Sequence, residues 1–314
     1  MESTLRATQW SEFIGQEKLK ARLTTHINAA RADGKMMEHV LLMGPPGFGK
    51  TTMARIIAAQ LLDPLKEFVA PIKIKALERE LKSWGDGGVL FIDEIHRFSK
   101  AEQEDLYSVF TDGVIHSPSG RTIQLPPITI IGATTEPERL SPPMFDRFPI
   151  QLKVAEYSDA EMALILQGMA GRIDFELNDG DALALARATG GVPRIAERFV
   201  LGGHNIEAND REATVAAILD LTGMDADGLS DDQVEYLTTL ADLGGEAGIE
   251  TLSAMLQVST TVLKRLERLL LKRQFLVYGP KGRELTNNGF TKVRANVTQQ
   301  GVAGPKTRRD RRDG

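Results

Sequence analysis

Residues 44–51, GPPGFGKT, constrain the fold of this chain more than any other segment. They match the phosphate-loop pattern G-x-x-x-x-G-K-[ST] and lie between a predicted buried strand at 39–44 and a predicted helix at 50–62, the context that this pattern requires. Glycines allow successive backbone N–H groups to point inward, and the following helix presents its positive end to phosphates. The sequence therefore predicts a nucleotide site. The residues expected to surround the phosphates are Gly44, Pro45, Pro46, Gly47, Phe48, Gly49, Lys50, Thr51 and Thr52.

An acidic pair after a second apolar segment supplies the other half of such a site. Residues 88–95, GVLFIDEI, predict a buried strand that ends near Asp93 and Glu94. Lys50 can reach the β- and γ-phosphates, while the Thr51 hydroxyl and the Asp93 carboxylate are suitable oxygen ligands for Mg²⁺. Glu94 can orient and deprotonate an attacking water as a general base. Two acids after a strand can also cap a helix, but beside the phosphate loop they indicate a site for ATP and Mg²⁺.

Apolar strands alternate with helices over the first half of the chain. Residues 17–33 carry apolar side chains at four-residue spacing, which predicts an amphipathic helix, and residues 128–135 predict a third buried strand. This alternation predicts an α/β fold with a parallel sheet and helices on both of its faces. From about Tyr157 to Gly223 the pattern is helical throughout.

The last part of the chain has the order of elements found in a winged helix. Ser230 and Gln233 form a capping box before a first helix, and residues 249–257 and 260–274 predict two more. A short strand, the turn GPKGR at 279–283 and a second strand follow. The predicted domains are a large nucleotide-binding domain at 1–156, a small helical lid domain at 157–228, a winged helix at 229–295 and a basic disordered tail at 296–314.

Charge is distributed unevenly along the chain. Residues 262–314 carry 14 Lys and Arg against four acids, a net charge of +10, whereas the rest carries −15. This asymmetry favours a polyanion-binding region at the C-terminal end, the alternative being a solvated basic helix with a frayed tail. The absence of cysteine excludes disulfides and cysteine-ligated metals. With no long apolar run and no leader-like segment at the start, we expect a cytoplasmic protein without membrane contact.

Several motifs together resemble AAA+ ATPases, and among them the RuvB family of motors that drive Holliday-junction branch migration. The segments are GPPGFGKT, LFIDEIHRFS, LPPITIIGATT and DRF, and the similarity extends from about Leu5 to Phe290 through FIGQ, GGVPRIAERF and the terminal winged helix. The resemblance implies an AAA+ P-loop domain, a lid and a winged helix. It also implies a homo-hexameric ring that uses ATP to translocate double-stranded DNA through a Holliday junction in recombination and repair.

The resemblance also implies roles for residues outside the phosphate loop. Thr135, rather than Thr134, matches the polar residue called sensor 1 near the γ-phosphate. Arg147 in DRF matches the arginine finger that reaches a neighbouring subunit's site, the alternative being a surface ion pair with Asp146. Arg194 in GGVPRIAERF matches sensor 2, which couples the lid to the nucleotide.

Nucleotide and DNA contacts are implied at six further residues. Leu5, Arg6, Ile14 and Tyr157 lie where the family places nucleotide contacts, although such side chains also serve plain core packing. The turn GPKGR matches the wing that touches the DNA backbone, so Lys281 and Arg283 are expected to contact phosphates without reading bases. The alternative for the turn is simply a tight hairpin.

The sequence departs from the family pattern in places that concern its partners. Residues 113–124 occupy the place of the hairpin by which RuvB motors meet the junction-binding protein RuvA, but the segment is shorter and lacks an apolar tip, with Val114 and Ile115 at its base. Phe145 and Pro149 replace an arginine and a glycine that flank the finger. A RuvA-like partner, another partner and unaided DNA binding all stay open.

Rival interpretations belong to other classes of protein. HRFSKAEQEDL and GATTEPERL also resemble the MgsA/RarA and clamp-loader branch of AAA+ proteins at replication forks, but a winged helix after Gly228 argues against that branch. A protein remodeller needs an aromatic pore loop, for which Trp84 is the nearest candidate, although Trp84 fits a core equally well. A non-catalytic scaffold is disfavoured because Lys50, Asp93 and Glu94 are all present.

Overall fold

The computed structural model describes residues 4–82, 84–116 and 122–300, which belong to two compact units. The first unit is Met1–His204 and the second is Asn205–Gly314. The predicted domain boundaries after residues 156, 228 and 295 stay predictions. The disordered tail was predicted from residue 296, but residues 296–300 are helical, and the rest of the tail, from residue 301 onward, lies outside the described residues.

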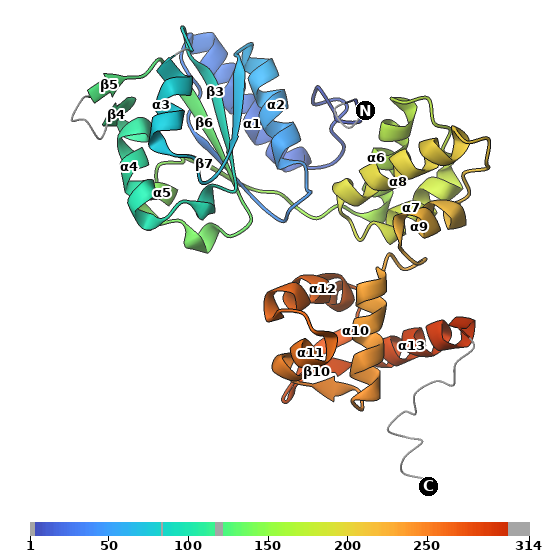
Figure 1. The fold of residues 1–314 in the computed structure, drawn as a ribbon. Helices are drawn as coiled ribbons and strands as arrows, with labels where there is room; N and C mark the ends of the chain where they lie inside the picture. Colours follow the sequence, from blue (N-terminus) through green and yellow to red (C-terminus); the bar gives the residue numbers. More distant parts are fainter. Residues whose placement is uncertain (1–3, 83, 117–121, 301–314) are drawn as a thin grey trace. The chain divides into compact units, whose positions relative to one another are not determined.

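A five-stranded parallel sheet forms the centre of the first unit, with the strand order β2-β3-β6-β1-β7. Its strands are β1 (Val40–Met43), β2 (Leu65–Val69), β3 (Gly88–Asp93), β6 (Ile128–Thr134) and β7 (Ile150–Lys153). The helices that begin in this unit are α1 (Glu17–Asp33), α2 (Lys50–Leu61), α3 (Ile74–Lys82), α4 (Lys100–Thr111), α5 (Pro142–Phe145), α6 (Asp159–Gly171), α7 (Asp179–Ala188) and α8 (Pro193–Glu207), with 3-10 turns at Ile95–Arg97 and Pro137–Arg139. Figure 1 shows α1 and α2 on one side of the sheet and α3 and α4 on the other. The predicted α/β fold is confirmed.

Burial explains which strands the sequence reveals. Every residue of β6 is buried, and in β3 only Asp93 is partly exposed, as expected for central strands of a sheet covered on both faces. β2, at one edge, reads LKEFV and keeps every side chain at least partly exposed, and β7 forms the other edge. Neither edge strand was predicted from the sequence.

The core beneath α3 and α4 contains Trp84 and Ile115, two residues for which the sequence allowed either core packing or contact with a partner. Trp84 is buried there among other apolar side chains, with Lys66 Nζ 5.3 Å from the centre of its ring. A buried tryptophan is not an exposed pore-loop aromatic, so the remodeller interpretation loses its nearest candidate. Ile115, at the base of the hairpin formed by β4 (Val114–His116) and β5 (Thr122–Gln124), is also fully buried in this core.

The second unit contains a winged helix with its own apolar core. Its elements are α9 (Val215–Thr222), α10 (Asp231–Asp242), β8 (Glu246–Ala247), α11 (Ile249–Leu256), α12 (Thr260–Lys272), β9 (Leu276–Gly279), β10 (Gly282–Leu285) and α13 (Asn287–Gln300). The strands pair antiparallel in the order β8-β10-β9, and the Ser230 N–H donates to Gln233 Oε1 at 3.0 Å before α10. The predicted order of three helices and a hairpin is confirmed, whereas β8 and α13 were not predicted.

The leucine stripe of α12 packs into this core. Leu263 and Leu270 are fully buried, while Leu266 and Leu269 are partly buried against the same cluster. Lys264 and Arg265 between them are exposed. The apolar face predicted for this helix is therefore its core face. None of the helices in the described segments is both long enough and apolar enough to span a membrane.

Candidate functional site

The phosphate loop connects β1 to α2, as the sequence predicts. Gly47 and Gly49 have φ angles of 79° and 85°, in the left-handed region that glycine adopts without strain. α2 begins at Lys50, whose side chain is only 6% exposed. Its Nζ donates to the carbonyl oxygens of Gly44 at 2.8 Å and Pro45 at 2.9 Å. The Lys50 ammonium group is thus held against the phosphate loop.

A cavity of about 510 Å³ opens beside this loop and collects most of the predicted nucleotide contacts. The predicted residues that line it are Leu5, Arg6, Ile14, Pro46, Gly47, Gly49, Lys50, Thr51, Thr52, Asp93, Glu94, Tyr157 and Arg194. The other predicted residues of the nucleotide site, Gly44, Pro45, Phe48, Thr135 and Arg147, are described by the structure but do not line the cavity. The lining residues that were not predicted from the sequence are Ala7, Glu12, Phe13, Leu164, Ile165, Gly168, Met169, Arg172, Pro193 and Glu197.

Two adjacent carboxylates stand at the end of β3. Glu94 adopts a left-handed backbone conformation with φ 51°, and its N–H donates to Asp93 Oδ1 at 2.9 Å. Burial raises the pKa of Asp93, and the negative charge of Glu94 raises it further, against the opposing charges of Lys50 and Arg194. A cation would relieve this repulsion. The Asp93 carboxylate and the Thr51 hydroxyl, which both line the cavity, are hard oxygen donors that fit Mg²⁺.

Glu94 is held from the side by two polar residues. The Thr135 hydroxyl donates to Glu94 Oε2 at 3.0 Å, and His96 Nδ1 lies 3.2 Å from the same oxygen. The buried Thr134 hydroxyl instead lies 3.0 Å from His96 Nδ1 and accepts the Glu136 N–H at 3.0 Å. Thr135, not Thr134, therefore touches the predicted general base. His96 was not identified from the sequence, since its link to Glu94 depends on the turn after β3.

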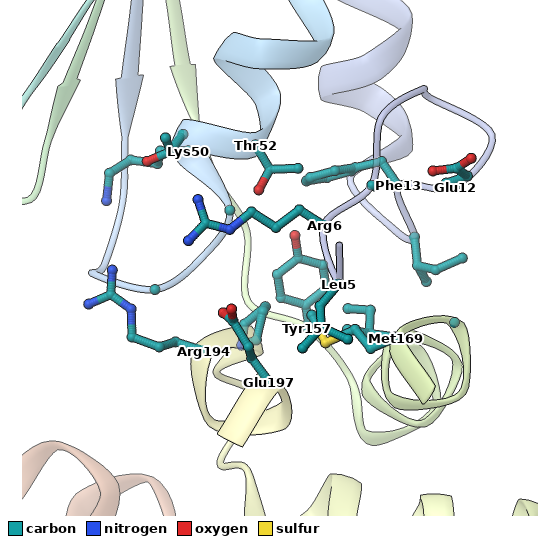
Figure 2. Close-up of a pocket in the computed structure, with 18 of the residues that line it drawn as sticks. Leu5, Arg6, Glu12, Phe13, Lys50, Thr52, Tyr157, Met169, Arg194 and Glu197 are labelled. Carbon is teal, nitrogen blue, oxygen red and sulfur yellow. The ribbon is translucent and has the colours of Figure 1, made fainter. Parts of the chain in front are cut away.

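Three cationic side chains, those of Arg6, Lys50 and Arg194, line one side of the cavity. Arg194 lies in the first turn of α8, and its backbone N–H donates to the Gly47 carbonyl at 3.3 Å, which attaches this helix to the phosphate loop. Figure 2 shows Arg6 extending toward the side of the cavity on which Lys50 and Arg194 lie. Positive charge from three separate segments suits a polyphosphate.

The rest of the cavity is largely apolar. Leu5 and Tyr157 are buried and lie close to Met169 of α6 in Figure 2. The Tyr157 hydroxyl donates to the Phe48 carbonyl at 3.5 Å, and burial raises the pKa of this phenol. α6 contributes Leu164 and Ile165 as a further wall. An apolar wall next to a cationic end is the arrangement that a base joined to phosphates requires.

Arg147 lies outside the cavity and is held by its neighbours. Its guanidinium donates to the Thr111 hydroxyl at 3.2 Å and to the Pro143 carbonyl at 2.7 Å, and it stacks 4.3 Å from the centre of the Tyr107 ring. Within the described residues, these contacts replace the ion pair with Asp146 that the sequence left as an alternative. Arg147 is thus half-buried among these neighbours, and it does not line the cavity of its own chain.

The two predicted DNA contacts differ sharply in their surroundings. Arg283 is 13% exposed in its side chain, and it donates from Nε to Glu267 Oε1 at 2.8 Å and from Nη2 to Glu267 Oε2 at 3.2 Å. Lys281, at the hairpin tip, is 75% exposed with Glu246 at 3.6 Å. The structure thus directs Arg283 inward, and Lys281 is the exposed member of the pair.

Two family models match the chain. The model described as the Holliday junction DNA helicase RuvB P-loop domain matches residues 5–154. The model described as the RuvB C-terminal winged helix domain matches residues 226–294. Together they cover most of the chain and include the phosphate loop, the acidic pair and the basic hairpin.

Similar proteins match along nearly their whole length. The Holliday junction branch migration complex subunit RuvB of Thermotoga petrophila is 36% identical over 312 residues, covering 94% of this chain and 93% of the relative. The protein of the same name from Fusobacterium nucleatum is 35% identical over 307 residues, covering 92% of each. The structure described as the Thermotoga maritima RuvB Holliday junction branch migration motor is 33% identical, with a TM-score of 0.77, and covers 96% of this chain and all of that one.

Proposed function

This chain belongs to the RuvB family, and from that premise we propose that it is an ATP-driven motor that moves double-stranded DNA through a Holliday junction. One observation carries the proposal. The first unit gathers Lys50, the acidic pair and Arg194 around one cavity, and the second unit contains a winged helix with an exposed lysine at its hairpin tip. ATP chemistry and a grip on DNA backbone are the two parts that such a motor needs.

Hydrolysis in this proposal uses the residues that line the cavity. Lys50 and the loop N–H groups bind the β- and γ-phosphates, and Glu94, oriented by Thr135, takes a proton from the attacking water. Mg²⁺, held by Thr51 and Asp93, would neutralise charge on the phosphates when bound. Arg194 contacts the phosphates from α8, so that nucleotide state is passed to the lid helices.

The finger acts between subunits. Because Arg147 does not line its own chain's cavity, we place it in the site of a neighbouring copy, where it stabilises charge on the transferring phosphoryl group. This arrangement requires an oligomer, and the homo-hexameric ring of AAA+ motors satisfies it. A monomer is then a poor ATPase.

The DNA grip is sequence-independent. Lys281 contacts a backbone phosphate, which suits a motor that has to pass over any sequence. Arg283 fixes the hairpin to α12 instead of touching DNA. A protein with this substrate works in the cytoplasm.

A contact with a junction-binding partner is expected at the hairpin of β4 and β5. Ile115 is buried in the core, so the apolar side chains that the base of the β4–β5 hairpin offers are the half-buried Val114 and Ile123. The rest of that predicted segment, residues 117–121, lies outside the described residues. We propose that a RuvA-like protein loads the ring at the junction, with a contact smaller than an apolar hairpin would give.

Two measurements test the function. The first is ATP hydrolysis by the full chain with and without duplex DNA, at low and physiological salt, beside Lys281→Ala. The second is migration of a synthetic four-way junction, with and without a RuvA-type protein. We expect stimulation by duplex that weakens with salt and falls in the variant. Hydrolysis that ignores DNA, together with no migration in either arm, contradicts the motor function.

A further inference from the structure

Leu5–Ile14, the first ten residues that the RuvB P-loop family model matches, form a segment that we call the N-terminal strap. Glu12 organises it, because its Oε2 accepts the Thr8 N–H at 2.9 Å and the Thr8 hydroxyl at 3.2 Å, and its Oε1 accepts from Gln9 Nε2 at 3.0 Å. These bonds hold the pKa of Glu12 below its ordinary value, chiefly through the Thr8 N–H. The strap is thus a closed turn built around one carboxylate.

The strap forms one wall of the nucleotide cavity, and α6 forms another. Leu5, Arg6 and Phe13 of the strap line the cavity, as do Leu164 and Met169 of α6. Leu5 is fully buried and Phe13 is 6% exposed. Figure 2 shows Leu5 close to Met169 on this side of the cavity. Any shift of the strap away from α6 therefore widens the apolar part of the site.

One end of the strap is anchored to the sheet domain. The Phe13 carbonyl accepts from Lys20 Nζ at 2.9 Å. Just beyond it, the Gln16 amide pairs with the backbone of Ala155, donating to its carbonyl at 2.8 Å and accepting its N–H at 2.9 Å. These contacts fix the strap after Phe13, but they do not hold the residues before Glu12.

The other end is tied by one arginine at the end of α6. Arg172 donates from Nη1 to the Leu5 carbonyl at 3.3 Å and from Nη2 to Glu12 Oε2 at 3.3 Å. Nη1 also donates to the Gly168 carbonyl of α6 at 3.0 Å. The side chains of Arg172 and Glu12 are largely shielded from solvent, being 24% and 31% exposed. The guanidinium thus joins the strap to the helix that faces it across the cavity.

We propose that Arg172 is a positioning residue for nucleotide binding, which acts with Glu12 to hold the N-terminal strap closed against α6. The inference rests on the proposed nucleotide site, but not on DNA translocation. Because the hydrogen bonds of Arg172 go to the strap and to α6, it acts on affinity through the shape of the pocket. It takes no part in the cleavage of the phosphate bond, which takes place near Glu94.

The test measures ADP binding by titration calorimetry and steady-state hydrolysis for Arg172→Ala, Arg172→Lys, Glu12→Ala and the double variant. Arg187→Ala is the matched control, since it removes the same charge from an exposed position of α7 that does not line the cavity. In Arg172→Ala, Kd for ADP and KM for ATP should rise about five- to tenfold, the range expected for losing partly shielded charged hydrogen bonds, with kcat kept. Arg172→Lys should restore part of the lost affinity, because it keeps the charge without the bidentate guanidinium.

The double-variant cycle separates a specific tie from general damage. If Arg172 and Glu12 act as a unit, the double variant binds ADP no more weakly than the worse single variant. Multiplying effects, an unchanged Kd in Arg172→Ala, or an equal loss in Arg187→Ala overturns the inference while leaving the motor function intact. A wild-type chain that binds no ADP overturns the nucleotide site and this inference together. Melting without nucleotide shows whether each variant is folded.

Discussion

Arg283 of β10 donates to both carboxylate oxygens of Glu267, whose side chain is fully buried on α12. Tyr236 donates to Oε1 and Tyr278 to Oε2 of the same carboxylate, each at 2.9 Å. Glu267 thus accepts four hydrogen bonds from α10, β9 and β10. The hairpin of the winged helix is fixed to its third helix by one saturated buried charge, which makes Arg283 a structural residue.

Removing Arg283 should destabilise the winged helix strongly. Arg283→Ala leaves a buried carboxylate without its cation, which costs about 3–5 kcal/mol in comparable buried pairs. Arg283→Lys should cost less, since it keeps the charge but cannot make the bidentate contact. Chemical denaturation of the full chain measures the effect, and Lys281→Ala, from the same hairpin, is the control that should unfold like wild type. If Arg283→Ala is as stable as wild type but loses DNA stimulation, Arg283 contacts DNA after all.

Acid should weaken the same network. Burial by itself raises the pKa of Glu267, but the hydrogen bonds from Arg283, Tyr236 and Tyr278 outweigh burial, so its pKa lies below 4.5. A carboxyl whose pKa is lowered by folding stabilises the fold fully above its unfolded pKa and loses that stabilisation as pH falls through its folded pKa. Stability measured from about pH 7 down to about pH 3 should therefore fall at the acid end. Glu267→Gln should be less stable at neutral pH and show a shallower acid slope, and an unchanged slope would remove Glu267 as its source.

The two neighbouring threonines after β6 should separate hydrolysis from stability. Thr135→Val removes the hydroxyl that holds Glu94, so kcat for ATP should fall by roughly 10²-fold with nucleotide affinity kept. Thr134→Val leaves the Glu136 N–H without its hydroxyl acceptor and removes one of the two partners of His96 Nδ1, which should cost about 1–3 kcal/mol of stability and lower activity less than Thr135→Val does. ATP hydrolysis rates and chemical denaturation of both variants show which threonine affects kcat and which affects stability. The reverse pattern would move the sensor role to Thr134.

The sequence predicted what depends on short continuous segments. The phosphate loop, the buried strands at its side and the acidic pair follow from local spacing, and the fold class with its winged helix is confirmed. The edge strand β2 was missed because LKEFV mixes charged and apolar side chains, as a half-exposed strand does. β7 was missed for a related reason, since only Ile150 and Leu152 alternate there.

The cavity shows where local pattern no longer suffices. Leu164, Ile165, Gly168 and Met169 line it because one face of α6 is turned toward the loop, and no spacing in the helix distinguishes that face from a core stripe. Arg283 shows the same limit in reverse. Its place in a glycine-rich turn suggests an exposed contact, but the sequence does not show that Glu267, sixteen residues earlier, would be buried beneath it.

The position of Arg147 predicts that active sites are shared between subunits. Arg147→Ala should bind ATP normally, since the residue does not line its own cavity, but kcat should fall by roughly 10³-fold or more. Glu94→Gln should be equally inactive for a different reason, because it lacks the general base but keeps the finger. The first measurement is hydrolysis by each protein alone, at concentrations where wild type is active.

Mixing the two inactive proteins is the decisive experiment. In a mixed ring, a chain with Arg147→Ala supplies an intact cavity and its Glu94→Gln neighbour supplies an intact finger, so about a quarter of the sites in a random equal mixture are complete. Activity should therefore reappear on mixing, and a third protein with both substitutions should fail to restore it to either one. If Arg147 served only its own chain, no mixture would recover hydrolysis. Recovery together with ring assembly by light scattering would assign Arg147 to the neighbouring site, because the two defects can complement each other only across a subunit boundary.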